Sequence, residues 1–149
     1  MTEAIVRSAA LEDLPEVLKL YRHLHPDDPQ LETAAAERVW STLLMSDFMT
    51  VIVAQTADML VSSCTLAIVP NLSRGGRSYG VIENVVTHAD YRRLGLGRRV
   101  LAQALDVARQ ADCYKVLLAT GSKQEATLRF YEGAGFERGG KTYFEVRRP

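Results

Sequence analysis

Apolar and polar residues follow two different periods along the chain, one typical of strands and one typical of helices. The N-terminal part begins with a strand-like segment and soon changes to the helical period. Residues 4–7 read Ala-Ile-Val-Arg and are typical of a first strand. The apolar positions that follow recur at helical spacing and predict a helix over residues 11–23. Residues 34–45 are rich in helix formers and predict a second helix. Two helices are therefore expected before most of the sheet.

The middle of the chain is dominated by strand-like segments. Residues 48–55 and 59–69 are rich in β-branched and apolar residues and predict an antiparallel hairpin. Residues 79–86 predict the next strand, and an apolar stripe over about residues 97–111 predicts a helix. Residues 114–119 again read as a strand. This strand, helix and strand form a βαβ unit, whose two strands we expect to be parallel and joined right-handedly.

The last part of the chain predicts one more helix and further strands. The helix is expected over residues 123–132, and Phe136 with residues 142–146 should supply the terminal strands. The fold class is therefore α/β, in the α+β sense of a mixed sheet. We expect a mostly antiparallel central sheet with one parallel βαβ crossover and flanking helices. Residues 1–149 are expected to form a single domain, because no repeat or linker interrupts the pattern.

Charge and hydropathy exclude two classes of partner. The 149 residues include 18 lysines and arginines and 18 aspartates and glutamates, so the chain lacks the positive field of a dedicated nucleic-acid binder. No apolar run is long enough to span a bilayer, and the N-terminal residues lack the pattern of a signal peptide. We therefore expect no nucleic-acid partner, no membrane partner and a cytoplasmic location.

The two cysteines carry no sign of a disulfide or a metal site. Cys64 and Cys113 lie far apart, and neither belongs to a Cys-x-x-Cys motif or a cluster with histidine. Both are expected to be small core residues. We predict no metal ion and no covalent intermediate on either thiol.

The segment with the clearest chemistry is a glycine turn between a strand and a helix. It reads Arg92-Arg-Leu-Gly-Leu-Gly97. Glycines allow the backbone to turn tightly, and the free N–H groups at the start of the next helix attract phosphate. The turn lacks the Gly-Lys-Ser/Thr ending of nucleotide triphosphatases and the longer glycine pattern of dinucleotide folds. A different cofactor that carries a pyrophosphate is therefore expected.

Three segments together resemble a known family. The turn at residues 92–97 has the form Gln/Arg-x-x-Gly-x-Gly/Ala, residues 90–92 read Asp-Tyr-Arg, and residues 130–136 read Phe-Tyr-Glu-Gly-Ala-Gly-Phe. In these features the chain resembles the GNAT family of acetyl-CoA-dependent N-acetyltransferases. The order of elements agrees with that family over nearly the whole chain. The resemblance implies acetyl-CoA as cosubstrate and no metal.

Within the family, local segments look most like glucosamine 6-phosphate N-acetyltransferase members. These are residues 77–86, residues 113–115 and residues 143–147. Two positions depart from the relatives: Asn84 stands where an aspartate usually follows the glutamate, and Thr127 stands where related enzymes often have an asparagine. The first departure weakens the assignment of an amino-sugar acceptor.

The resemblance also implies two catalytic residues. Glu83 matches the general base, and its carboxylate would take a proton from the attacking amine directly or through water. Tyr131 matches the tyrosine whose hydroxyl protonates the departing thiolate. Each has a structural alternative, which is a solvated or ion-paired carboxylate for Glu83 and aromatic packing for Tyr131.

The cofactor contacts carried over from the family lie on the strand, the turn and the helix after them. A bulge near Asn84 would leave backbone N–H groups free to bind pantetheine and polarise the acetyl carbonyl. The predicted cofactor-binding residues are Val85, Val86, Thr87, Arg92, Arg93, Leu94, Gly95, Leu96, Gly97, Arg98 and Thr127.

The acceptor is less well defined by the sequence. Arg74, Arg77 and Arg147 would recognise a phosphate or carboxylate on the substrate, and Asn84 is a further candidate. We expect acetyl transfer to a primary amine of a small molecule by direct attack. Acetylation of a protein N-terminus or lysine and a non-catalytic acetyl-CoA sensor remain alternatives. An exposed terminal strand would also permit a homodimer.

Overall fold

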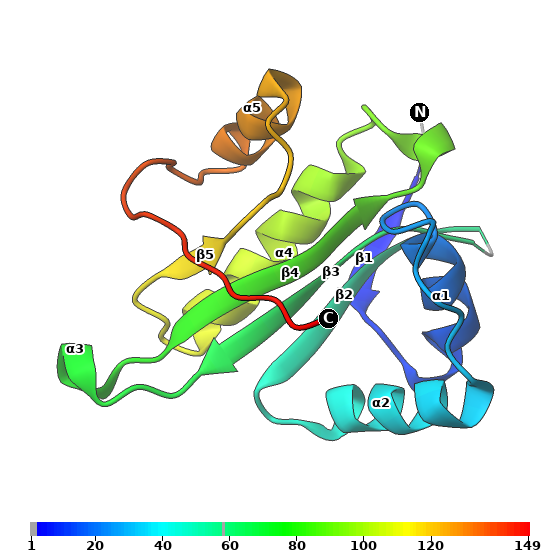
Figure 1. Cartoon of the computed structure of the whole chain (residues 1–149), viewed down its shortest axis with the longest axis horizontal. Coiled ribbons are helices and arrows are strands. Elements are labelled where there is room, and N and C mark those ends of the chain that lie inside the picture. Colours follow the sequence, from blue (N-terminus) through cyan, green and yellow to red (C-terminus); the bar gives the residue numbers. More distant parts are fainter. Residues whose placement is uncertain (1–2, 58) are drawn as a thin grey trace.

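A computed structural model describes residues 3–57 and 59–149, and its centre is a five-stranded sheet (Figure 1). The strands lie in the order β1-β2-β3-β4-β5. The strands are β1 (Ile5–Ser8), β2 (Met49–Thr56), β3 (Met59–Val69), β4 (Tyr79–Thr87) and β5 (Val116–Leu118). The helices are α1 (Leu14–Tyr21), α2 (Thr33–Met45), α3 (Ser73–Gly76), α4 (Leu96–Gln110) and α5 (Glu125–Gly133). Two 3₁₀ turns, η1 (Leu11–Asp13) and η2 (Ala89–Tyr91), precede α1 and α4.

The sheet confirms the predicted topology. The first four strands pair antiparallel with their sequence neighbours, and β4 pairs parallel with β5. The long helix α4 connects these two parallel strands, as expected for a βαβ unit. The fold is therefore α/β, with a mixed and mostly antiparallel sheet.

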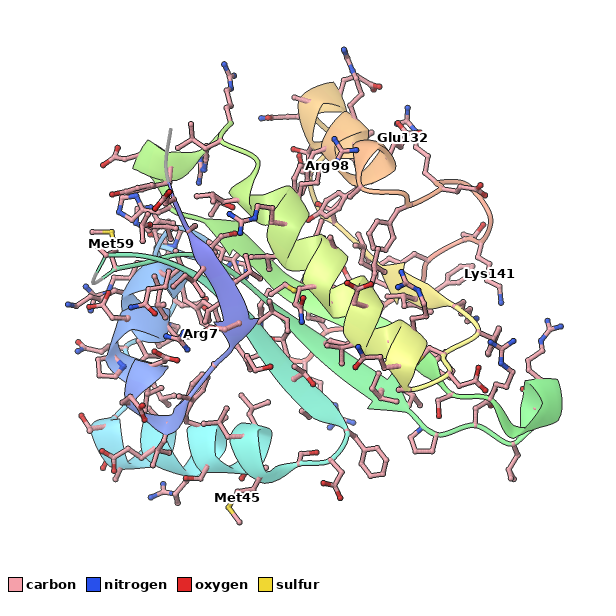
Figure 2. The ribbon with its side chains drawn as sticks, turned by 180° about the vertical axis from the view of Figure 1, so that it is seen from behind. Arg7, Met45, Met59, Arg98, Glu132 and Lys141 are labelled. Atoms are coloured by element: carbon pink, nitrogen blue, oxygen red, sulfur yellow. The ribbon has the colours of Figure 1, made fainter. Side chains whose placement is uncertain are left out.

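Helices cover both faces of the sheet. In Figure 1, α1 and α2 lie on the near face, and the view from behind in Figure 2 shows α4 crossing the opposite face. The core on the α4 face includes Ile52, Cys64 and Leu101. A second apolar cluster on the α1 and α2 face includes Val17 and Trp40. Side chains thus alternate between two cores along β2 and β3, which explains why both strands are apolar throughout.

Two buried serines on β3 have hydrogen-bond partners on the neighbouring strands. The Ser63 hydroxyl donates to the carbonyl of Ile52 at 2.8 Å, and the Ser62 hydroxyl donates to the carbonyl of Val86 at 3.0 Å. Buried hydroxyls without partners would destabilise the sheet. The Ser63 bond therefore joins β3 to β2, and the Ser62 bond helps to hold the second half of β4, beyond its pairing with β5.

Several boundaries differ from the sequence predictions. The first predicted helix is divided into η1 and α1 and ends at Tyr21. The segment before β4 contains the short helix α3, which the sequence analysis did not predict. The prediction of terminal strands at Phe136 and residues 142–146 is wrong, because the described residues there have no strand assignment. Residues 137–149 are exposed and do not pair with the sheet. Their alternating pattern therefore does not form a strand, because the backbone N–H and C=O groups of a strand need a neighbouring strand as partner.

None of the helices within residues 3–57 and 59–149 combines the length and the apolar character needed to cross a bilayer.

Candidate functional site

The centre of the candidate site is a bulge in β4. Thr65 of β3 lies opposite Glu83 and Ser63 lies opposite Val86, so the single residue Cys64 faces two residues of β4. One of these two is Asn84, whose φ of 54° is unusual for a residue with a side chain. The structure thus confirms the bulge that was expected near this position. After the bulge, the side chains of β4 point to the opposite face from the one that a regular strand would give them.

The bulge separates the catalytic candidate from the core on the α4 face. Ile82 packs in the core beside α4, so its neighbour Glu83 points to the α1 face with its cross-strand partner Thr65. Val85 also contacts the α4 core, only three positions after Ile82. An unbulged strand would place residues three apart on opposite faces. The Glu83 side chain itself is exposed.

An opening in the sheet lies beside this bulge. The pairing of β4 with β5 extends only from Gly80 to Ile82 on β4, and β5 ends at Leu118. β4 continues to Thr87 while the chain after β5 turns away to α5, as Figure 1 shows. The second half of β4 therefore offers its edge to a ligand. The predicted cofactor residues Val85, Val86 and Thr87 all lie on this part of the strand.

The glycine turn has the backbone geometry of an anion site. Arg93 has a φ of 64° and Gly95 a φ of 79°, and α4 begins directly afterwards at Leu96. No side chain caps the start of α4, and its first turn contains no acidic residue. The first N–H groups of a helix point outward and carry partial positive charge. They would bind the pyrophosphate of a cofactor here without competition from a carboxylate.

Gly97 allows close packing just inside the helix. A Cβ atom at this position would lie 3.0 Å from Cζ of Phe130 and 3.2 Å from Oγ1 of Thr87. Leu96 and Gly97 are buried, whereas Leu94 is exposed at the tip of the turn. The two glycines therefore have different roles, since Gly95 supplies a left-handed backbone and Gly97 supplies space.

The arginines of the turn are already engaged with carbonyl groups. Nε of Arg92 donates to the carbonyl of Thr87 at 3.2 Å, and Arg98 donates to the carbonyl of Gly133. Figure 2 shows Arg98 near Glu132 at the end of α5. Arg92 thus braces the turn against β4, and Arg98 connects α4 to α5. Both guanidinium groups remain exposed and are close enough to the turn to add positive charge.

Helix α5 brings the second catalytic candidate to the site. The Tyr131 ring packs edge-on against Phe130 and Phe136, with centroid distances of 5.0 and 6.4 Å. Burial is the main reason why the pKa of Tyr131 is raised, and the charge of Glu83 makes a smaller contribution in the same direction. Tyr131 is therefore both a packed aromatic residue and a neutral hydroxyl.

Thr127 lies one turn earlier on the same helix. Its hydroxyl accepts a hydrogen bond from the hydroxyl of Ser122 at 3.1 Å. Ser122 belongs to the segment between β5 and α5, which forms the far side of the opening in the sheet. Thr127 thus helps to fix this segment, and its predicted contact with the cofactor stays a prediction.

The C-terminal segment carries a small cluster of polar side chains. The Tyr143 hydroxyl donates to Glu145 at 3.0 Å, and this hydrogen bond is the main reason why the pKa of Tyr143 is raised. The charge of Glu83 makes a smaller contribution in the same direction. Nε of Arg147 donates to Glu145 at 3.3 Å. Arg147 is therefore close to Tyr143 in an exposed tail.

Two other predicted acceptor residues lie away from this centre. Arg77 forms an ion pair with Asp112 at 3.1 Å, and the guanidinium of Arg74 lies 5.7 Å from the ring centroid of Tyr114. Both precede β4, and the six residues from Arg77 to Glu83 span roughly 20 Å of extended chain. The structure brings Asn84 to the bulge but leaves these two arginines at the opposite end of the strand.

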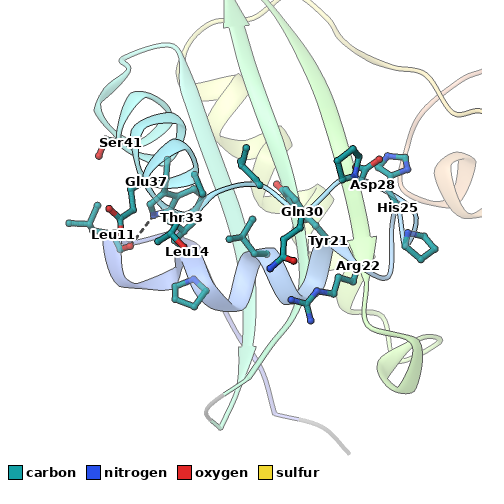
Figure 3. Close-up of a pocket in the computed structure, with 17 residues that line it drawn as sticks. Leu11, Leu14, Tyr21, Arg22, His25, Asp28, Gln30, Thr33, Glu37 and Ser41 are labelled. Atoms are coloured by element: carbon teal, nitrogen blue, oxygen red, sulfur yellow. Dashed lines mark hydrogen bonds between the residues drawn. The ribbon is translucent and has the colours of Figure 1, made fainter. Parts of the chain in front are cut away.

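A hollow that the sequence analysis missed lies between α1, α2 and the segment joining them. Its volume is about 1140 Å³, and Figure 3 shows it extending along α1 toward Tyr21. Much of the wall is apolar, with Leu14, Leu18 and Trp40 among its residues, and Arg22 lies near the Tyr21 end. The sequence analysis assigned residues 11–23 only to a helix, whose apolar stripe ends near Tyr21. A tyrosine at the end of that stripe was the available signal, because its hydroxyl requires a polar partner.

The free cysteines are poorly suited to nucleophilic catalysis. Cys64 is fully buried, and burial raises the pKa of its thiol to about 12. Burial also raises the pKa of Cys113. A thiolate is the nucleophilic form of cysteine, so both thiols are unreactive near neutral pH. Within the described residues, no group of three or more His, Cys, Asp or Glu side chains gathers to hold a metal.

Comparison with known proteins agrees with this geometry. The acetyltransferase (GNAT) family model matches residues 14–136. A solved structure from Agrobacterium tumefaciens that is assigned to the acetyltransferases has a TM-score of 0.91 and 43% identity, covering 97% of this chain and 99% of that one.

Two curated relatives match part of the chain. Glucosamine 6-phosphate N-acetyltransferase of Trypanosoma brucei brucei is 40% identical over 82 residues, which are 55% of this chain and 54% of the relative. N-alpha-acetyltransferase 30 of Xenopus laevis is 30% identical over 82 residues, which are 54% of this chain and 30% of the relative. The match thus spans about half the length of the first relative and less of the second. With the family model covering most of its length, the chain belongs to the acetyltransferase (GNAT) family.

Proposed function

We propose that this protein transfers an acetyl group from acetyl-CoA to a primary amine of a small molecule by direct attack. The observation that carries the proposal is the β4 bulge, which turns Glu83 toward the α1 face while Tyr131 lies within its electrostatic reach. An acetyl thioester bound along the open edge of β4 would then have a candidate base and a candidate acid beside it.

The cofactor would occupy two adjacent parts of the site. Its pyrophosphate would bind at the start of α4, where the turn at Arg93 and Gly95 leaves N–H groups exposed. Its pantetheine arm would follow the edge of β4 from Thr87 toward Val85. The bulge at Asn84 would place backbone donors beside the thioester carbonyl, where they stabilise an oxyanion.

Transfer would proceed in one addition and one elimination. The neutral amine attacks the thioester carbon, a C–N bond forms, and the carbonyl oxygen becomes an oxyanion. Glu83 accepts a proton from the amine nitrogen, directly or through water. The C–S bond then breaks, and Tyr131 supplies a proton to the departing thiolate. The unreactive state of Cys64 supports direct transfer rather than an acetyl-cysteine intermediate.

A phosphorylated amino sugar is a reasonable first acceptor to test, because the Trypanosoma brucei brucei relative is named for one. Arg147, which lies in the exposed tail and donates to Glu145, is a predicted anion-binding residue that is free of contacts at the far end of β4. Arg74 and Arg77 lie at the other end of β4 and are engaged with Tyr114 and Asp112. The acceptor site would therefore rely on Arg147 more than on those two residues.

A protein N-terminus is the second candidate acceptor. The relative from Xenopus laevis is named as an N-alpha-acetyltransferase, and the hollow beside α1 is long and partly apolar, as a groove for a peptide would be. A peptide acceptor would contact this hollow through side chains that a sugar lacks. Acetylated peptides in the assay described next would favour this candidate.

The test is release of free CoA from acetyl-CoA in the presence of different amines. The panel includes glucosamine 6-phosphate, amino acids, polyamines, aminoglycosides, N-terminal peptides and lysine peptides. Release that depends on one acceptor class supports the enzyme and identifies its substrate class. Binding of acetyl-CoA without release by any amine would favour the sensor alternative, and failure to bind acetyl-CoA would contradict the assigned cosubstrate.

Glu83→Gln tests the base. We expect kcat to fall by about 100-fold or more at neutral pH, since a positioned general base contributes about that factor. The Kd for acetyl-CoA should stay within about twofold of wild type, because Glu83 faces the acceptor side of β4. Glu137→Gln, an exposed change outside the site, is the matched control. Equal kcat values for the Glu83 variant and wild type across pH would remove Glu83 from the mechanism.

We also propose that the working form is a homodimer. The exposed tail carries Phe144 and Val146, which are 86% and 93% exposed, and the outer edge of β5 has Leu117 at 41% exposed. β5 is the last strand of the sheet, so this edge is available to another chain. A second copy that adds its tail to this edge would cover apolar surface on both chains.

A further inference from the structure

We infer that His23 and His88 are positioning residues for cofactor binding, because as a stacked neutral pair they hold η2, which leads directly into the glycine turn at residues 92–97. Protonation of the pair would release η2 and weaken the binding of acetyl-CoA. The inference rests on the proposed function, since it assigns the two histidines a role in the same cofactor site. Neither imidazole would contact the cofactor itself.

The pair joins two elements that lie far apart in the sequence. His23 follows the end of α1, where its backbone N–H donates to the carbonyl of Leu20 at 3.0 Å. His88 follows the end of β4, and its backbone N–H donates to the carbonyl of Val61 on β3 at 2.8 Å. The two ring centroids are 4.1 Å apart, with 41° between the ring planes. Figure 1 shows the end of α1 close to the segment after β4.

Both imidazoles accept a hydrogen bond from the backbone of η2. The N–H of Ala89 donates to Nδ1 of His23 at 3.4 Å, and the N–H of Asp90 donates to Nδ1 of His88 at 3.1 Å. The N–H of Tyr91 donates to the carbonyl of His88 at 2.9 Å. The first N–H groups of a helical turn have no partner within the turn, so side-chain acceptors stabilise it. Two of the three partners of η2 are imidazole nitrogens.

These hydrogen bonds define the protonation state of the pair. A nitrogen that accepts a hydrogen bond carries a free electron pair, so Nδ1 of each ring is unprotonated and the ring proton lies on Nε2. A proton added to Nδ1 would convert the acceptor into a donor that faces a backbone N–H. Two positively charged rings at 4.1 Å would also repel each other. The arrangement therefore favours two neutral rings.

The groups around the pair also favour the neutral form of His23. Desolvation is the main reason why the pKa of His23 is lowered, and the charges of His88 and Arg92 lower it further. The carboxylate of Asp90 acts in the opposite direction. The ring of Tyr91 packs edge-on against His88, with centroids 5.4 Å apart, and β3 contributes no acidic or basic residue. The net effect opposes protonation of the pair in the folded protein.

The connection from η2 to the cofactor site is short. η2 ends at Tyr91, and Nε of the next residue, Arg92, donates to the carbonyl of Thr87 at 3.2 Å. This bond closes the segment that contains His88 and all of η2. The left-handed residue Gly95 and the start of α4 follow immediately. A displacement of η2 would therefore move the N–H groups that are proposed to bind the pyrophosphate.

The first test compares the Kd for acetyl-CoA in wild-type protein and in the double variant His23→Gln/His88→Asn, from about pH 5.5 to about pH 7.5. The oxygens of asparagine and glutamine accept hydrogen bonds but do not titrate, and asparagine is a favourable N-cap residue. We expect wild-type affinity to fall by about fivefold more than that of the variant as the pH decreases. Ionisation of the cofactor phosphates is common to both proteins, so the ratio of the two Kd values isolates the histidine pair.

His25→Gln is the matched control, because it changes the third histidine, which is exposed and outside the pair. It should keep the wild-type pH profile. Parallel profiles in wild-type protein and the double variant would overturn the inference. A wild-type affinity that rises relative to the variant at acid pH would also overturn it, since added positive charge would then outweigh the loss of η2.

Long-range ¹H–¹⁵N correlation spectra test the protonation state without changing the pair. We expect His23 and His88 to carry their proton on Nε2 at neutral pH, and His23 to titrate below its ordinary value of 6.5. The His25→Gln spectrum assigns the signals of the pair, because the chain has three histidines. A proton on Nδ1 of either ring, or titration of His23 above pH 6.5, would contradict the inferred arrangement.

Urea denaturation provides a reading that needs no acetyl-CoA. Because the pKa of His23 is lowered in the folded state, the unfolded chain binds more protons below about pH 6.5. The wild-type midpoint should therefore decrease between about pH 7 and about pH 5.5 by more than that of the double variant. Equal decreases would overturn the inference. Absence of acetyl-CoA binding by wild-type protein at neutral pH would instead contradict the proposed function, so the two failures are distinguishable.

Discussion

At the scale of single residues, environment determines how Glu83 and Tyr131 differ. Glu83 is exposed on the α1 face, whereas Tyr131 is half-buried between two phenylalanine rings. Burial raises the pKa of Tyr131, so the hydroxyl keeps its proton at any pH at which the protein would work. An exposed carboxylate and a protonated phenol are suited to accept and to supply a proton, respectively.

This environment predicts the pH dependence of the reaction. Because the pKa of Tyr131 lies above its usual value of 10.0, the acid form persists below that pH. We expect kcat in wild-type protein to show no alkaline fall before about pH 10. Tyr131→Phe should lower kcat by roughly 100-fold at every pH in that range, since the acid is lost rather than titrated. Steady-state rates from pH 6 to pH 10 measure both effects.

The control for that change is Tyr79→Phe, which removes a hydroxyl outside the site. Tyr131→Phe should also keep the wild-type melting temperature to within a few degrees, because the ring and its contacts with Phe130 and Phe136 remain. Wild-type kcat in Tyr131→Phe would return this tyrosine to a purely packing role. An alkaline fall near pH 8 in wild-type protein would assign the titration to another group.

At the scale of elements, the junction of β4 and α4 depends on the backbone at Gly95. Its φ of 79° is favourable for glycine and strained for any residue with a Cβ atom, although open space surrounds the position. Gly95→Ala should therefore destabilise the turn by about 1 kcal/mol through the backbone alone. Since the turn presents the N–H groups of α4, we expect affinity for acetyl-CoA to fall by roughly fivefold.

Gly121→Ala is the matched control, because a Cβ atom there would meet nothing within 4 Å and its φ lies outside the left-handed range. Calorimetric titration of both variants with acetyl-CoA gives the comparison. Equal affinity in the two variants would show that the geometry of the turn does not control cofactor binding. A loss in both would indicate a nonspecific effect of added side chains.

Local patterns explain why most elements were predictable. The apolar stripe of α4 and the β-branched runs of β2 and β3 are properties of the segments themselves, and the turn at Gly95 is a local motif. The terminal strands were not predictable in this way, because a strand also needs a partner edge that its own alternation does not supply. Residues 142–146 have the alternation but remain exposed and unassigned to a strand.

The same distinction separates the site residues. Glu83 and Tyr131 could be proposed from the sequence because they belong to segments that resemble the family. Arg77 was expected near the acceptor, but the structure pairs it with Asp112. Spacing along the chain therefore predicts local chemistry better than it predicts contacts between distant elements.

At the scale of the whole molecule, the C-terminal tail exposes apolar side chains that the rest of the described chain leaves uncovered. Tyr143, Phe144 and Val146 are 66%, 86% and 93% exposed within one short segment. Contiguous exposed apolar side chains commonly mark an interface. Pairing of the tail with a second copy would therefore determine the oligomeric state.

Truncation after residue 140 tests this link. We expect wild-type protein to have twice the mass of its 16.5 kDa chain in sedimentation equilibrium and the truncated form to be monomeric. Phe144→Asp should weaken the dimer by about tenfold or more, because burial of an aromatic side chain would be lost. Leu72→Asp changes another highly exposed apolar residue outside the tail and should leave the dimer intact.

A monomeric wild-type protein, or a truncated form that remains dimeric, would contradict exchange of the tail between copies. If truncation lowers kcat while acetyl-CoA still binds, the tail contributes to the acceptor side of the site, as proposed for Arg147.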